Sequence, residues 1–154
     1  MRITELLIGL GWHIARADEV PGMPKATGGC FRDVRYIVIK NGLPLAKFNR
    51  VLLHECGHAL EEEYKRRFKD FWRLFSDELI KEMVAVDEYR FKKSGYSIDD
   101  FESARDEAFA ELAADWLEVQ CVFRLPSMRL NWEFKRIMNH VITILAVEVI
   151  RNKG

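Results

Sequence analysis

The chain has 154 residues, of which 24 are basic and 24 acidic, so its formal net charge at pH 7 is zero. This length predicts a single domain over residues 1–154, built around one hydrophobic core. The balanced charge excludes a broad electrostatic attraction to nucleic acid or to a membrane surface, and no segment reaches the roughly 20 apolar residues that span a bilayer. Composition leaves the oligomeric state unknown.

The three cysteines, Cys30, Cys56 and Cys121, cannot all pair within one chain, and they form no Cys-x-x-Cys motif. This usage is typical of a reducing compartment, so we expect a cytoplasmic protein. The N-terminal segment carries Glu5 where a signal peptide needs positive charge, and its apolar run breaks at His13. It therefore predicts an amphipathic first helix rather than a secretion signal.

Glycine and proline concentrate in the first 45 residues, where we expect β and irregular structure. Residues 35–40 are rich in β-branched and aromatic side chains and are followed by Asn41-Gly42, a strong turn signal. In chain order, the pattern predicts a helix over 2–10, a strand over 12–17, a loop over 21–29 and a strand over 35–40. We expect the strands to form a small antiparallel sheet.

Beyond Pro44 the pattern becomes helical. Proline suits the first turn of a helix, and apolar residues recur at helical spacing from there through residue 60. Later helices are predicted from about 76 to 93, from Ser97 or Asp99 to about 122, and from about 130 to 151. The whole chain is thus predicted to be an α+β domain: mostly helical, with a small antiparallel β-sheet near the N-terminus and a central helix carrying VLLHECGHAL (51–60).

That central segment contains His54, Glu55 and His58 in the pattern H-E-x-x-H. Residues four apart on a helix are offset by about 40°, so both imidazoles point the same way and can reach one zinc ion. Glu55 lies on the flank of this face, where it can serve as a general base toward a water molecule. Gly57 costs about 0.8–1.0 kcal/mol relative to alanine inside a helix, which indicates close approach of another backbone or of a substrate.

Catalytic zinc needs a third protein ligand. Glu107, Glu111 and Asp115 are spaced four apart on a later helical segment and share one face, flanked by alanines that permit close helix packing. In one pairing Glu111 binds zinc and Asp115 accepts a hydrogen bond from a ligating histidine; in the other Glu107 binds zinc and Glu111 takes the supporting role. We favour Glu111 as the ligand, because the shorter Asp115 reaches a ring nitrogen without crowding the metal.

Residues 36–44, Arg50-Val51-Leu52-Leu53 and the H-E-C-G-H motif resemble the ImmA/IrrE family of small zinc metallopeptidases. In that family an arginine shortly precedes H-E-x-G-H, and the third ligand typically lies in E-x-x-A-(N/D), which residues 111–115 match. The resemblance implies a gluzincin-type peptidase with Glu111 as third ligand, Asp115 beside it and an intracellular regulatory protein as substrate.

A second resemblance gives a different ligand. Glu107-Ala108-Phe109-Ala110-Glu111 is similar to the third-ligand helix in the protease domain of anthrax lethal factor, which implies Glu107 as the ligand and a tyrosine upstream that assists catalysis. Tyr96 is the nearest candidate. From the residues alone, Tyr96, Tyr89 or a backbone N–H could stabilise the oxyanion.

We therefore expect a zinc-dependent endopeptidase that acts on a protein or peptide, with no nucleic-acid or membrane partner. His54, His58 and Glu111 are expected to hold Zn²⁺, which polarises the scissile carbonyl. Glu55 is expected to take a proton from water and pass it to the leaving amine. The alternative is a metal-binding regulatory or interaction module without peptidase activity.

Overall fold

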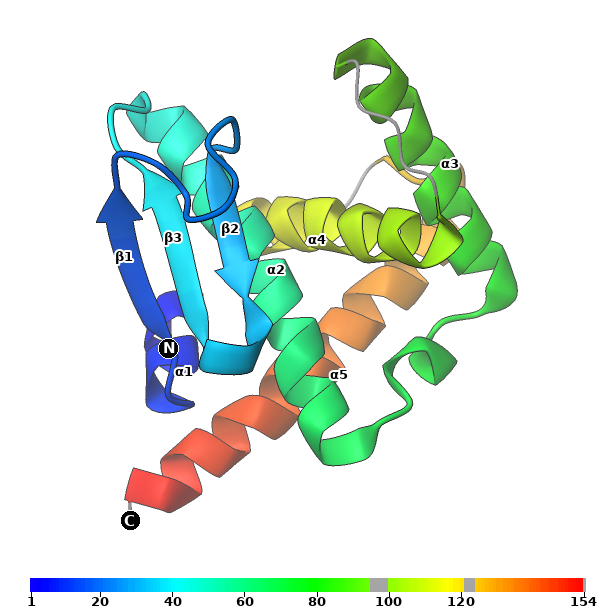
Figure 1. Ribbon diagram of the computed structural model, residues 1–154. Coiled ribbons are helices and arrows are strands. Elements are labelled where there is room, and N and C mark those ends of the chain that lie inside the picture. The colour runs from blue at the N-terminus through cyan, green and yellow to red at the C-terminus, as the bar shows by residue number, and fades with distance from the viewer. Residues whose placement is uncertain (95–99, 121–123, 154) are drawn as a thin grey trace.

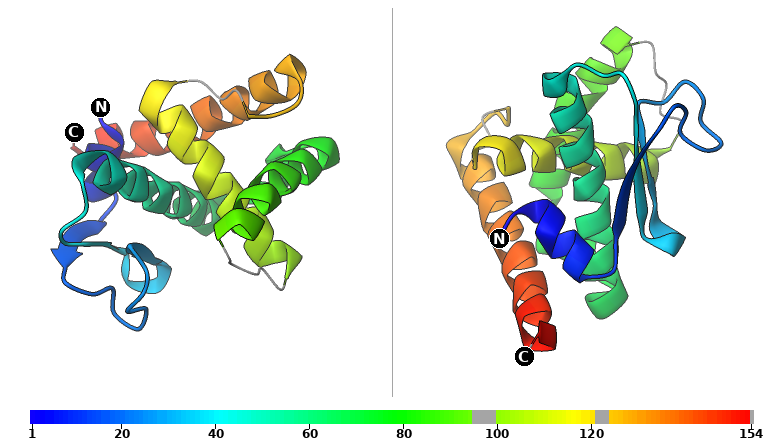
Figure 2. Two further views of the ribbon diagram at one scale, coloured as in Figure 1. Left: turned by 90° about the horizontal axis from the view of Figure 1, so that it is seen from above. Right: turned by 90° about the vertical axis from the view of Figure 1, so that its left-hand side faces the viewer.

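The structure of the chain is a computed structural model that describes residues 1–94, 100–120 and 124–153, with the backbone alone for 89–94. Its elements in chain order are α1 (Ile3–Gly9), β1 (His13–Ala17), β2 (Gly28–Phe31), η1 (Arg32–Val34), β3 (Tyr36–Lys40), α2 (Leu45–Phe68), η2 (Phe71–Leu74), α3 (Asp77–Ser94), α4 (Phe101–Val119) and α5 (Met128–Lys153). The sheet lies on one side of α2, and α4 and α5 cross its other side (Figures 1 and 2). The predicted fold class, mostly helical α+β with a small sheet near the N-terminus, is confirmed.

The sheet has three strands in the order β1-β3-β2. Strand β2 pairs antiparallel with β3, as expected, but β1 pairs parallel with β3, so the sheet is mixed and the all-antiparallel prediction is wrong for that pair. The strands alternate in direction along the chain. The first and third therefore run the same way, and they become neighbours because β2 takes the far side of β3.

Strand β2 begins inside the segment that the sequence predicts as a loop. Its first two residues are glycines, which are weak strand formers, and here they allow close packing. A Cβ on Gly28 would lie 2.4 Å from Val51 Cγ1 of α2, and a Cβ on Gly29 would lie 2.8 Å from Val20 Cγ1. The sequence pattern does not predict β2, because tertiary packing rather than strand propensity requires glycine at positions 28 and 29.

The long helix α2 starts directly after Pro44, which has φ −56° and is the N-cap residue. The helix continues past the predicted motif to Phe68, and Lys69 then ends it with φ +59°. It buries residues over most of its length, including Val51, Cys56, Ala59, Leu60 and Tyr64, so it is the central element of the core. The prediction of a central helix for VLLHECGHAL is confirmed.

A buried carboxylate ties the end of α2 to the rest of the fold. Glu63 has no solvent-exposed surface. Trp12 Nε1 donates to its Oε1 at 2.8 Å, Arg35 Nε donates to the same oxygen at 2.6 Å, and Arg67 Nη1 donates to its Oε2 at 2.6 Å. Because an unpaired charge at this depth would be strongly destabilising, these donors make Glu63 a structural crosslink.

The remaining helices start and end close to their predicted positions. Asp100 caps α4 by accepting from Ser103 N at 3.0 Å, whereas the predicted starts, Ser97 and Asp99, lie outside the described residues. Helix α5 buries one face and leaves Val147 and Ile150 exposed. Among the described helices, none combines the length and apolar content needed to cross a bilayer.

Candidate metal centre

His54 and His58 lie one turn apart on α2 and point to the same carboxylate. His54 Nε2 is 3.0 Å from Glu107 Oε2, and His58 Nε2 is 3.0 Å from Glu107 Oε1. The two rings are nearly perpendicular, at an interplanar angle of 78°. Within the described part of the chain, ligand atoms of these three residues all lie within 4.8 Å of one another, a grouping that could hold a metal ion.

The third member of this cluster is Glu107, whereas the sequence analysis favoured Glu111. Glu111 instead lies on the other ring nitrogen of His54, with Oε1 2.7 Å from Nδ1. Asp115, predicted to support a histidine, accepts from Arg50 Nη1 at 2.5 Å, and its Oδ2 forms an ion pair with Arg124 Nε at 2.9 Å. The arrangement corresponds to the second predicted pairing, with Glu107 facing the histidines and Glu111 behind His54.

The contact between α2 and α4 explains which turn of α4 faces the histidines. A Cβ on Gly57 would lie 3.0 Å from Ala110 Cα, 3.3 Å from Ala110 O and 3.1 Å from Ala113 Cβ. The two helices therefore cross with backbone against backbone at this glycine, which confirms the predicted close approach (Figure 1). Glu107 lies one turn before Ala110 on α4, and the crossing point brings that turn to His54 and His58.

Two arginines lie beside the cluster: Arg50 holds Glu111, the partner of His54, and Arg32 contacts His58 directly. Arg50 Nη2 donates to Glu111 Oε2 at 2.7 Å and to Glu111 O at 3.0 Å. Arg32 Nη2 lies 3.1 Å from His58 Nδ1, and its Nη1 donates to Glu61 Oε2 at 3.0 Å. No local pattern predicts a role for Arg32, because it lies in η1 and reaches α2 only through the packing of the sheet on that helix.

Glu55, the predicted general base, lies on the side of α2 that faces β2. Its exposed fraction is 8%, and a Cβ on Gly28 would lie 3.4 Å from its Cγ. Burial raises the pKa of Glu55 above the ordinary carboxyl value, although the histidines beside it act in the opposite direction. A raised carboxyl pKa suits a group that must accept and then release a proton near neutral pH.

The histidines and Glu107 also perturb one another. Burial alone would raise the pKa of Glu107, but the hydrogen bonds from His54 and His58 outweigh burial and hold that pKa well below the ordinary carboxyl range. Burial would lower the pKa of His54, but its hydrogen bond to Glu107 and the surrounding carboxylates raise it. The carboxylate is thus ionised and attracts positive charge into the space between the rings.

The spacing of the cluster fits a small divalent ion. A tetrahedral zinc ion with bonds of about 2.0–2.1 Å separates its ligands by about 3.3 Å, close to the 3.0 Å that separates each Nε2 atom from Glu107. Glu107 keeps 37% of its side chain exposed, so the cluster is open to solvent on one side. Catalytic zinc sites need such an open position, whereas structural sites are closed.

Other predicted candidates contribute less. Tyr96 and the side chain of Tyr89, proposed as oxyanion donors, lie outside the described residues. Cys56 has no exposed surface and belongs to the core rather than to the cluster. His140 is exposed on α5, and its Nε2 lies 3.1 Å from Tyr64 Oη.

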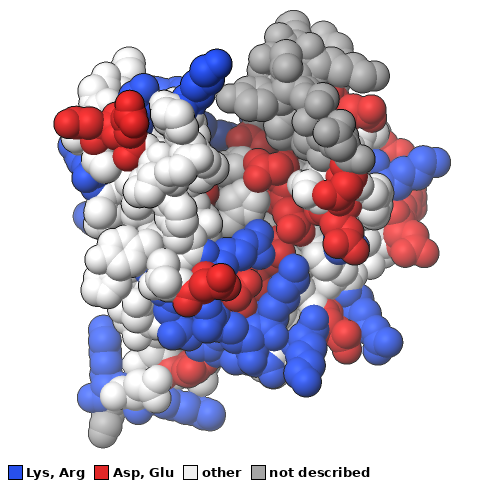
Figure 3. Space-filling view, viewed as in Figure 1, with Lys and Arg blue, Asp and Glu red and all other residues white. Residues whose placement is uncertain are grey.

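The surface around the site separates the two signs of charge although the chain is neutral overall. On the face seen in Figure 1, acidic side chains gather where α3 and α4 meet, and basic side chains lie below them, over the lower half of α2 (Figure 3). Opposite charges also pair locally: Arg32 and Arg66 both form ion pairs with Glu62.

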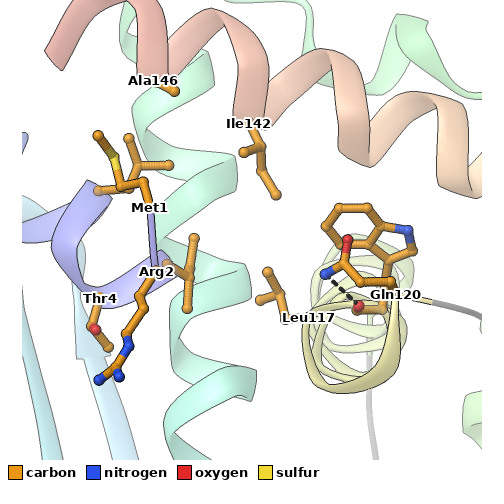
Figure 4. Close-up of a pocket in the computed structure, with 10 residues that line it drawn as sticks. Met1, Arg2, Thr4, Leu117, Gln120, Ile142 and Ala146 are labelled. Carbon is orange, nitrogen blue, oxygen red and sulfur yellow. Dashed lines mark hydrogen bonds between the residues drawn. The ribbon is translucent and has the colours of Figure 1, made fainter. Parts of the chain in front are cut away.

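A separate cavity of about 440 Å³ lies between the N-terminal segment, the end of α4 and α5. Figure 4 shows Met1 and Thr4 on one side of it and Leu117 and Gln120 on the other, with Ile142 and Ala146 from α5 above. None of the residues of the histidine cluster lines it. It therefore forms no part of the candidate metal centre.

The chain was compared with models of known protein families, with curated proteins and with solved structures. None of the three comparisons found a match. Functional inference therefore rests on the residues and geometry of the site.

Proposed function

We propose that the chain is a zinc-dependent peptidase in which His54, His58 and Glu107 hold the ion. The observation that carries this proposal is the convergence of both Nε2 atoms on one ionised carboxylate, 3.0 Å from each, with the buried Glu55 next to His54 in the chain. Two histidines and a glutamate with an open position form a donor set typical of catalytic zinc.

The chemistry divides between the metal and the chain. Zinc, when bound, polarises a peptide carbonyl and makes water nucleophilic near neutral pH. Glu55 accepts the proton of the attacking water and transfers it to the departing amine, for which its raised pKa is suitable. The hydrogen bond between His54 and Glu111 keeps one ring nitrogen occupied, so the other remains directed at the ion.

Strand β2 offers a place for the substrate. It pairs with β3 on one side and has no strand partner on its other side within residues 1–94, 100–120 and 124–153. An extended peptide can add to such an edge through main-chain hydrogen bonds. Gly28 of this strand lies against Glu55, so a peptide bound along β2 has its backbone close to the general base.

Of the two resemblances, the position of Glu107 favours the one to the lethal factor protease domain, in which the first glutamate of E-x-x-x-E is the ligand. The substrate class remains a protein or peptide on this proposal. The ImmA/IrrE resemblance, which implies an intracellular regulatory substrate, goes with Glu111 as the ligand, whereas the 2.7 Å contact of Glu111 with His54 Nδ1 supports a role for Glu111 beside the ligand.

The proposal is tested with Glu55→Gln. The variant is expected to bind one zinc ion per chain as the wild type does and to lose hydrolysis of a mixed peptide library, because the amide cannot accept the proton. Glu102→Gln, an exposed glutamate of α4, is the matched control and should retain activity. Zinc content is measured by metal analysis, and cleavage by mass spectrometry with and without a chelator.

Two results contradict the proposal. Wild-type cleavage rates in Glu55→Gln would exclude the mechanism. A folded, zinc-loaded wild-type protein that cleaves no peptide in the library would favour the metal-binding regulatory module instead. Metal analysis of Glu107→Ala and Glu111→Ala separates the ligand choices, since loss of a ligand should abolish zinc binding.

A further inference from the structure

A chain of ion pairs extends from the histidine cluster to the loop after α4. His54 Nδ1 is 2.7 Å from Glu111 Oε1, and Glu111 Oε2 accepts from Arg50 at 2.7 Å. Arg50 also contacts Asp115 at 2.5 Å, and Asp115 Oδ2 forms an ion pair with Arg124 Nε at 2.9 Å. Arg50 lies one turn before His54 on α2. The same helix therefore carries His54 and the arginine that holds Glu111, the carboxylate partner of His54.

The direction of these hydrogen bonds follows from the donors available. Arginine has only donors, so both Glu111 oxygen atoms that it contacts, Oε2 and the main-chain O, are acceptors. A carboxylate held by a guanidinium stays ionised, and its second oxygen also accepts. A neutral histidine that binds an ion through Nε2 carries its hydrogen on Nδ1, and for His54 the acceptor of that hydrogen is Glu111 Oε1, 2.7 Å away.

We infer that Arg50 is a positioning residue for metal binding: through Glu111, it fixes His54 in the tautomer and ring orientation that a ligand requires. The inference rests on the proposed zinc site and adds a residue that touches neither the ion nor the substrate. Outer partners of this kind change metal affinity by about 10–100-fold when they are removed.

His58 provides an internal contrast. Its Nδ1 faces the donor Arg32 Nη2 at 3.1 Å rather than a carboxylate. A neutral imidazole that binds an ion through Nε2 carries its hydrogen on Nδ1, which an arginine donor opposes. Arg32 must therefore turn toward its carboxylate neighbours when His58 binds an ion, and Glu61 and Asp106 lie within 3.8 Å of it. The two arginines are expected to affect metal binding in opposite ways.

Comparing Arg50 with Arg32 distinguishes a positioning role from the electrostatic effect of a nearby positive charge on zinc affinity. Removing a positive charge near a cation site should strengthen cation binding, so a purely electrostatic view predicts tighter zinc binding in both Arg50→Gln and Arg32→Gln. The positioning role predicts about 10–100-fold weaker binding in Arg50→Gln and binding at least as tight as wild type in Arg32→Gln. Glu111→Gln should resemble Arg50→Gln, and Arg50→Lys should recover part of the loss.

The experiment measures zinc affinity by competition with a chromogenic chelator in the full chain, with circular dichroism to verify folding. Arg129→Gln, which removes an exposed pair with Glu78, is the neutral control. Wild-type or tighter affinity in Arg50→Gln, or an equal loss in Arg32→Gln, overturns the inference. A loss confined to Arg50→Gln and Glu111→Gln supports it.

A spectroscopic measurement on zinc-free protein tests the effect of Arg50 on His54 without depending on zinc binding or on peptide hydrolysis. The ¹⁵N chemical shifts of the His54 ring are measured at alkaline pH in zinc-free Glu107→Ala, which lacks the carboxylate that faces Nε2, and they show which nitrogen carries the hydrogen. This variant should have the hydrogen on Nδ1, and adding Arg50→Gln should give a mixture; an unchanged tautomer in the double variant overturns the inference. Absent zinc binding or absent peptide cleavage in wild type would contradict the proposed function alone.

Discussion

Replacing Gly57 with alanine tests whether the helix crossing sets the geometry of the site. Helix propensity alone favours alanine by about 0.8–1.0 kcal/mol. The new Cβ, however, would lie 3.0 Å from Ala110 Cα and 3.1 Å from Ala113 Cβ. Two of its three nearest atoms belong to the α4 backbone, which no side-chain rotation can move away.

The expected magnitude follows from these opposing effects. Overfilling a tight contact costs about 1–3 kcal/mol, so the net change is a destabilisation of about 0–2 kcal/mol. At about 2–4 °C per kcal/mol for a chain of this size, Tm should fall by up to about 8 °C, whereas propensity alone would raise it by about 2–4 °C. Displacement of α4 should also move Glu107 and weaken zinc binding.

Thermal unfolding followed by circular dichroism measures the effect on stability. Ala85→Gly, at an exposed position of α3, calibrates the propensity difference in this protein and should lose about 0.8–1.0 kcal/mol. A Gly57→Ala variant with higher Tm and unchanged zinc affinity would refute the reasoning, because it would mean that α4 is not held at this contact.

Three further outcomes are expected. Zinc at about 100 times its Kd should stabilise the protein by about 2.7 kcal/mol and raise Tm by about 5–11 °C in calorimetry, and His58→Ala should abolish the rise. Burial would raise the pKa of Glu63, but hydrogen bonds from Arg35, Arg67 and Trp12 hold that pKa below 4.5. The ionised Glu63 therefore stabilises the fold above pH 4.5, and this stabilisation is lost as the pH falls further. Urea unfolding should therefore show a gap of about 3 kcal/mol between wild type and Glu63→Gln at pH 7 that narrows in acid; a constant gap would contradict this. Burial raises the pKa of Cys56 to about 12, so iodoacetamide at pH 8 should leave it unmodified until the protein unfolds, as read by mass spectrometry.

The sequence predicted that His54 and His58 share one face of α2, because that feature depends on one helix alone. Residues four apart share a face in any α-helix, so His54 and His58 had to point the same way once the helix formed. The close contact at Gly57 could also be predicted, because glycine destabilises a helix interior and is favoured there only where another backbone comes close. Strand β2 was missed for the opposite reason: its glycines are selected by contact with α2, which no local pattern records.

What the sequence determined is the set of side chains that one helix presents together: two imidazoles with Glu55 on α2, and a stripe of three acids on α4. What only the tertiary structure decided is the register between those helices. One helical turn is 5.4 Å, so a shift of one turn exchanges Glu107 for Glu111, and the spacing within α4 is identical in both cases. The backbone contact of Gly57 with Ala110 sets that register, and it places Glu107 at the histidines and Glu111 between His54 and Arg50.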